Sequence, residues 1–288
     1  MGVKHSVSYQ NGENMAKKTD EELYDVAITM IGSVAKLPVI RVDREAFLRQ
    51  QFAGSEYLDE ILQHGPQHVY TVESLRRKAD GVIKKSTNQT TLAAFVAGIP
   101  GGPAAVAAGG ADVAQYFGFA INLAQKIAYL FGEDDLFTDE SELNEGAKVR
   151  VLAYLGVMLG ASGSAMLVGK LAREVGKNMG KKITQQALTK TTWYPLLKKI
   201  GAMVGKRVVK ESVGKAVAKV VPVVGGAISG AMTYATFKPM GGRLADVLVR
   251  NLNGEFDETG MELRPEFKKA NTADADTEVT IHEIEIDD

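Results

Sequence analysis

The sequence contains no cysteine among its 288 residues. This absence excludes disulfide bonds, thiolate zinc sites, cysteine-ligated iron–sulfur clusters and cysteine nucleophiles. It also suits a reducing compartment. Residues 1–18 lack the apolar run of a secretory signal peptide, so we expect a cytoplasmic location.

Histidine is also scarce, with four residues. His64 and His68 flank Gly65-Pro66, and this break prevents the two rings from sharing one helix face as metal ligands. Phosphate-loop, dinucleotide-binding and serine-nucleophile motifs are all missing. We therefore expect no metal and no cofactor, and the sequence favours a protein that is not an enzyme.

Charge is divided unevenly along the chain, although the net charge is only −1. Residues 170–219 hold 13 Lys and Arg against two Glu, a net charge of +11. Residues 255–288 hold 12 Asp and Glu against three Lys and Arg, a net charge of −9. A second acidic run, residues 133–145, is typical of a solvated loop because it lacks the alternating ligand pattern of a calcium site. No base-reading motif accompanies the basic segment, so we expect no nucleic acid partner.

Hydrophobic periodicity predicts an all-α protein with a single helical domain. Thr19 and Glu22 form a capping box before the first helix, and shorter helices are expected near 44–52, 57–63 and 71–85. We expect a flexible tail over 1–18, a helical domain over 19–250 and an acidic tail over 251–288.

The strongest helical pattern starts at Asp112 and ends before Gly132. Asp112 follows 26 uncharged residues, so we expect it to cap this helix. An alternative is a polar contact between Asp112 and Gln125 or Lys126 of the same helix.

Two uncharged runs, 151–169 and 220–237, are long enough to cross a membrane. The same pattern is typical of buried helices in a large core, and the sequence leaves both readings open. Pairs of glycines four residues apart allow helices to approach closely. Gly156/Gly160 and Gly226/Gly230 are the strongest such pairs because they lie inside the apolar runs.

The basic segment alternates Lys and Arg with apolar residues, which is typical of helices that lie on an anionic lipid surface. The alternative is an ordinary solvated face. The membrane-surface candidates are Lys181, Lys182, Lys190, Trp193, Tyr194, Lys198, Lys199, Lys206, Arg207 and Lys210.

Four elements of the sequence belong together: Gly98-Ile99-Pro100-Gly101-Gly102, Ala111-Asp112, the block from Leu123 to Gly132, and Pro222-Val223-Val224-Gly225-Gly226. Together they resemble the bacterial EcsC family, and also a helical domain of unknown function attached to some bacterial GTPases. The likeness covers roughly residues 65–250 and includes the block from Leu123 to Gly132. The resemblance implies an α-helical protein without agreed catalytic residues, and the family's namesake accompanies a transporter operon linked to secretion. The residues that carry the likeness, or that we expect to shape the fold beside them, are Gly98, Pro100, Gly101, Gly102, Asp112, Gln125, Gly132, Pro222, Gly225, Gly226 and Gly230.

Taken together, the sequence favours a non-enzymatic helical protein at the inner face of the cell membrane, with a regulatory or scaffolding role and a protein partner as a further expectation. One alternative is a soluble helical protein that encloses an apolar or lipid ligand. Another is an enzyme whose pocket of convergent carboxylates is not visible in a sequence.

Overall fold

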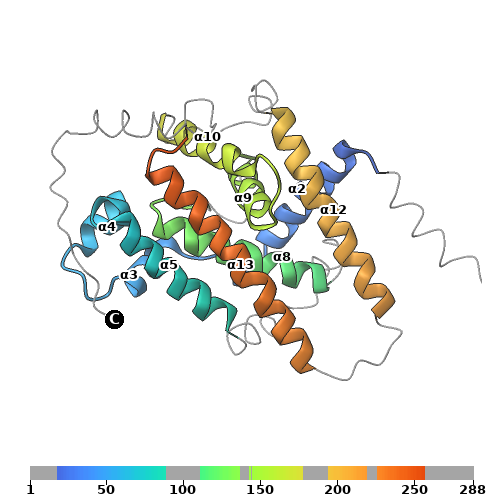
Figure 1. Ribbon diagram of the computed structural model, residues 1–288, viewed down its shortest axis with the longest axis horizontal. Helices are drawn as coiled ribbons and strands as arrows, with labels where there is room; N and C mark the ends of the chain where they lie inside the picture. Colours follow the sequence, from blue (N-terminus) through green and yellow to red (C-terminus); the bar gives the residue numbers. More distant parts are fainter. Residues whose placement is uncertain are drawn as a thin grey trace, which may run out of the picture.

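Helices make up most of the described structure. The computed structural model describes residues 18–88, 111–136, 143, 145–177, 194–218 and 226–256. Within these residues it contains nine helices and no strand, and 79% of them are helical. The predicted all-α fold is therefore confirmed. Figure 1 shows α3, α4 and α5 at one end of the molecule, α2 and α12 at the other, and α8 running between them.

The first helices begin and end where the sequence predicts. In α2 (Asp20–Ala35), the Glu22 amide donates to the Thr19 hydroxyl at 3.2 Å and the Glu22 carboxylate accepts from the Thr19 amide at 2.7 Å, completing the capping box. A short 3₁₀ turn, η1 (Pro38–Ile40), leads to α3 (Arg44–Gln51) and α4 (Leu58–His64). A second such turn, η2 (Pro66–His68), precedes α5 (Val72–Thr87).

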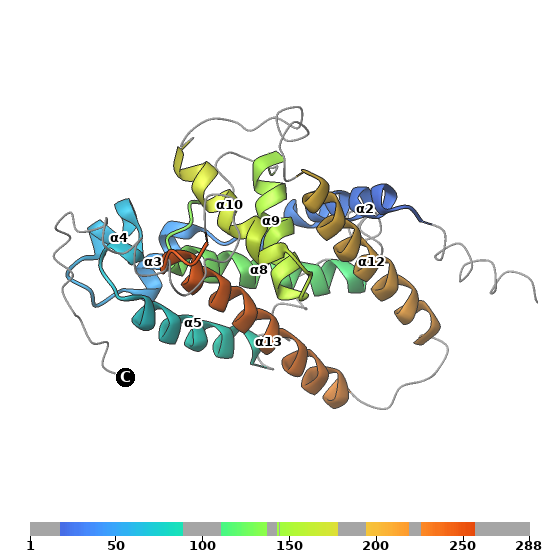
Figure 2. The same cartoon turned by 45° about the horizontal axis from the view of Figure 1, so that its top comes forward.

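The helix α8 (Ala111–Leu130) forms the centre of the core. It packs against α5 and α13 on one side and α9 on another, and Figure 2 shows it between these elements. Its C-terminus is closed by Gly132 at φ +84°. The Gly132 amide donates to Tyr129 O and the Glu133 amide to Ala128 O, the paired bonds of a Schellman cap. The predicted end of this helix is confirmed.

The apolar run 151–169 forms parts of two helices. The first, α9 (Glu145–Met158), is buried on every side from Val149 to Met158. A turn with Gly160 and Gly163 at positive φ then leads to α10 (Ser164–Lys177). Gly160, the second glycine of the predicted pair, therefore lies in a turn. The predicted role of Gly160 in close helix packing is wrong, because a Cβ built there meets no atom within 4 Å.

Within the described residues, no single helix has both the length and the apolar character needed to cross a membrane. One pair of helical segments, Asp20–Ala35 and Pro38–Gln51, meets these criteria of length and composition when the two are taken together, but they are bent by 98° relative to each other. In this structure the apolar side chains of α2 belong to the buried core, including Ala27, Ile31 and Val34 at 0% exposure.

Two long helices complete the fold. They are α12 (Tyr194–Ala218) and α13 (Gly226–Leu252), which has Pro239 in its interior. The closest glycine contact joins α12 to α2, because a Cβ built on Gly205 would overlap the backbone carbonyl of Leu23. A Cβ on Gly201 would likewise overlap the ring of Tyr24. Close packing among the described glycines is therefore carried by this pair outside the apolar runs. Within the run 151–169 it is also carried by Gly156, because a Cβ built there would overlap the Ile200 side chain of α12.

Several predictions concern residues for which the structure gives no side-chain account. Asp112 lies in the first turn of α8 and Gly226 and Gly230 in the first turns of α13, but their side chains lie outside the described residues. The predicted capping role of Asp112 and the packing role of the glycine pair stay predictions. The remaining motif residues outside the described part of the chain are Gly98, Pro100, Gly101, Gly102, Pro222 and Gly225.

Candidate functional site

One face of α12 carries exposed lysines. Lys199, Lys206 and Lys210 are exposed, and Met203 lies among them with 43% of its surface exposed. Their spacing of four, three and four residues places all four side chains on one side of the helix. We call these four residues the α12 basic face. No Asp or Glu occurs between residues 194 and 210.

The opposite side of α12 is fixed by the core. Its buried side chains are Leu197, Ile200, Val204 and Val208. The helix packs more extensively against α2 than against any other described helix, through the two glycine contacts. The orientation of the α12 basic face therefore follows from burial of the apolar side, which leaves the lysines at the surface.

Three of the predicted membrane-surface residues make contacts within the molecule. The ring of Tyr194 packs edge-on against Tyr24, with centroids 6.4 Å apart. The ammonium group of Lys198 lies 2.6 Å from the carboxylate of Glu21. The guanidinium of Arg207 lies 5.7 Å from the ring centroid of Tyr116.

The structure thus brings Lys199, Lys206 and Lys210 together on the surface and turns Arg207 partly inward. The other candidates, Lys181, Lys182, Lys190 and Trp193, lie outside the described residues.

Gln125 has a structural role that its helical position alone does not reveal. Its side chain is fully buried, and its Oε1 accepts from the Val42 amide at 3.0 Å. Its Nε2 donates to Ile40 O at 2.8 Å and to Ile121 O at 3.1 Å. Asp112 is 13 residues away in the same helix, about 20 Å along the axis. Its expected contact with Gln125 or Lys126 involves a side chain outside the described residues and stays a prediction.

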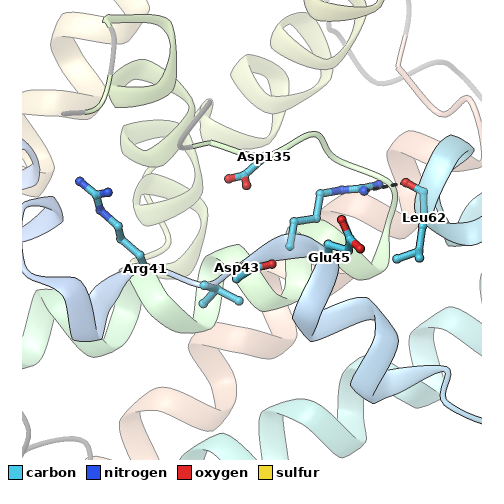
Figure 3. Close-up of a pocket in the computed structure, with 7 residues that line it drawn as sticks. Arg41, Asp43, Glu45, Leu62 and Asp135 are labelled. Atoms are coloured by element: carbon cyan, nitrogen blue, oxygen red, sulfur yellow. Dashed lines mark hydrogen bonds between the residues drawn. The ribbon is translucent and has the colours of Figure 1, made fainter. Parts of the chain in front are cut away.

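The segment that Gln125 holds lines an open pocket of about 480 Å³. Figure 3 shows Asp135 between Arg41 on one side and Glu45 with Leu62 on the other. Nη1 of Arg44 donates to Leu62 O at 3.1 Å across the pocket edge. The lining is mostly charged: Arg41, Val42, Asp43, Arg44, Glu45, Leu62 and Asp135.

The three carboxylates of this pocket already have partners in the chain. Asp43 Oδ1 accepts from the Ala46 amide as the cap of α3, and Glu45 pairs with Arg49. Asp135 Oδ1 accepts from the Tyr129 hydroxyl at 3.0 Å. In the part of the chain that the structure describes, no group of three His, Asp or Glu side chains is arranged to hold a metal ion. These contacts explain the carboxylates as structural groups.

A buried ion pair lies close to this pocket, and sequence reasoning missed it. Glu133 belongs to the acidic run expected to be solvated, but only 11% of its side chain is exposed. Its carboxylate lies 2.5 Å from the Arg150 guanidinium and accepts from the Tyr154 hydroxyl at 2.9 Å. The cap at Gly132 turns the chain so that Glu133 faces α9. The available signal was Arg150 itself, the last charged residue before the uncharged run 151–169.

Burial and charge shift the pKa values in this network. Burial raises the pKa of Tyr154, and the Glu133 carboxylate raises it further. Burial lowers the pKa of Arg150, but the charges and hydrogen bonds of Tyr154 and Glu133 outweigh it, and the net shift is upward. Arg150 therefore remains a cation, and Tyr154 remains neutral at physiological pH. The ion pair between Glu133 and Arg150 joins the end of α8 to α9.

In comparisons with protein-family models, with curated proteins and with solved structures, no match to this chain is found.

Proposed function

We propose that this chain is a non-enzymatic helical protein that binds the anionic inner surface of the cell membrane through the α12 basic face. The observation that supports it is the row of Lys199, Lys206 and Lys210 around Met203. A regulatory or scaffolding role, and membership of the EcsC family, belong to the same proposal.

The positive charge of this face should give it a measurable affinity for an anionic membrane. Each Lys held near an anionic leaflet contributes about 1 kcal/mol of binding free energy. Three lysines would therefore contribute about 3 kcal/mol, roughly a hundredfold in the dissociation constant. Met203 adds an apolar side chain that can enter the headgroup layer, as interfacial helices require.

Vesicle co-sedimentation tests the proposal. We expect the full chain to bind vesicles of phosphatidylcholine with 30% phosphatidylserine, and to bind them less tightly as NaCl rises from 50 to 500 mM. The variant K199Q/K206Q/K210Q should bind at least tenfold more weakly. Equal binding to pure phosphatidylcholine vesicles would contradict the electrostatic mechanism.

A matched control removes the same charge elsewhere. Lys36, Lys84 and Lys85 are exposed and lie on α5 or just after α2. The variant K36Q/K84Q/K85Q should retain most of the vesicle affinity, because these side chains do not belong to the α12 basic face. An equal loss in both variants would show that only the net charge matters.

The expectation of an apolar ligand finds less support in the described residues. The one pocket described above has a charged lining, which suits water or a polar molecule better than a lipid chain. The glycine-rich segment 98–110, whose helix breaks could open an apolar pocket, lies outside the described residues.

A further inference from the structure

The C-terminal segment of this sequence and the α12 basic face have opposite charges. Residues 271–288 contain seven Asp and Glu and no Lys or Arg. The α12 basic face presents three lysines, and among the described residues no carboxylate forms an ion pair with any of them. Such a surface can accept an acidic peptide as readily as an anionic lipid, because both present closely spaced negative groups.

The chain is also connected in a way that makes this contact reachable. Phe256, the last described residue, is buried against Gly169 of α10. That helix packs against both α13 and α12, so Phe256 lies one helix away from α12. Packed helix axes lie about 8–10 Å apart. The 32 residues that follow Phe256 can span up to about 105 Å when extended.

We propose that the acidic segment 271–288 binds the α12 basic face of the same chain and competes there with the membrane. The competition with the membrane rests on the proposed function, but the contact between the segment and the α12 basic face can be tested without lipid. It adds regulation to that surface: anionic lipid must displace the segment, and the segment lowers the apparent affinity for the membrane.

The contact is tested with a carbodiimide, which joins carboxylates directly to amines, on the full chain in low salt. Mass spectrometry of the monomer band should show peptides of 271–288 coupled to Lys199, Lys206 or Lys210. The coupling should fall at least fivefold in 0.5 M NaCl. Coupling of 271–288 only to other lysines, or no coupling to α12, would overturn the proposal.

The competition is tested with the full-length variant D274N/D276N/E278Q/E283Q/E285Q. It should bind phosphatidylserine vesicles at least fivefold more tightly than the natural chain at 50 mM NaCl. General repulsion between the acidic segment and the vesicle would also produce some gain, and it would do so without the α12 lysines. The gain should therefore be much smaller in the K199Q/K206Q/K210Q background, and equal gains in both backgrounds would refute competition at this face.

The two proposals fail in distinguishable ways. If no form of the chain binds anionic vesicles while carbodiimide couples 271–288 to the α12 lysines, the membrane function is wrong and the intramolecular contact stands. If vesicles bind through the three lysines but no such coupling occurs, the membrane function stands and this inference is wrong.

Discussion

At the scale of single residues, Gly205 determines how closely α12 approaches α2. Gly205→Ala should lower the free energy of unfolding by about 1–3 kcal/mol, because the new Cβ would overlap the backbone carbonyl of Leu23. A backbone carbonyl cannot move aside as a flexible side chain can, so the two helices would have to separate. Urea denaturation monitored by circular dichroism measures the change.

Gly242 provides the matched control for this substitution. It also lies inside a long helix, but a Cβ built there meets no atom within 4 Å. Gly242→Ala should therefore leave stability unchanged or raise it by up to about 1 kcal/mol, since alanine favours helix more than glycine does. If the two substitutions had equal effects, the close contact between α12 and α2 would be wrong.

At the scale of elements, Gln125 of α8 holds the non-helical segment before α3. Gln125→Leu should lower the free energy of unfolding by about 2–4 kcal/mol, because the Val42 amide would lose its buried partner and the Ile40 carbonyl would lose the shorter of its two side-chain hydrogen bonds. Hydrogen exchange at the Val42 amide should accelerate. Asn122→Ala provides the comparison, since its contacts to Val39 O and Ile40 O are longer, at 3.4 and 3.3 Å, and it should cost less. Unchanged exchange at Val42 in Gln125→Leu would contradict the anchoring role.

Much of the element order could be predicted from the sequence because its signals are local. The capping box at Thr19, the break at Gly65-Pro66 and the end of α8 at Gly132 each depend on residues within a few positions of one another. Helical periodicity adds the apolar faces between these boundaries.

The contacts that position the candidate sites could not be predicted in this way. Two partners of Gln125, Ile40 and Val42, lie more than 80 residues away in the sequence. Gly205 likewise contacts Leu23 of α2, which is far from it in the sequence. Glu133 appeared solvated because its neighbours in sequence are acidic, and its partner Arg150 is supplied by the next helix. Periodicity identifies which face of a helix is buried, but not which helix covers it.

At the scale of the whole molecule, buried tyrosines should make the fold sensitive to alkali. Burial, with smaller contributions from Tyr194, Glu145 and Asp25, raises the pKa of Tyr24 to about 12. Burial also raises the pKa of Tyr129, with the Asp135 carboxylate next in importance, and that of Tyr154. In the unfolded chain each hydroxyl has a pKa near 10.

The sign of the pH effect follows from which state loses its protons first. Above about pH 10 the unfolded chain ionises these tyrosines while the folded chain keeps them neutral, so the stability that they contribute is present below pH 10 and declines as pH rises. For the well-buried Tyr129 and Tyr154, the slope approaches about 1.4 kcal/mol per pH unit each. Absorbance of tyrosinate at 295 nm should rise for these residues only as circular dichroism reports unfolding.

Tyr129→Phe isolates one of these contributions. The substitution removes the hydroxyl that donates to Asp135, so it should lower stability at neutral pH by about 1 kcal/mol. It should also reduce the loss of stability between pH 10 and 11.5 by about 1.4 kcal/mol per pH unit, because one tyrosine no longer ionises on unfolding. The difference between variant and natural chain cancels the titration of lysines common to both. If urea denaturation gave the same pH slope for both proteins, Tyr129 would have to ionise equally in the folded state, and its place in the closed core between α8 and the following loop would be wrong.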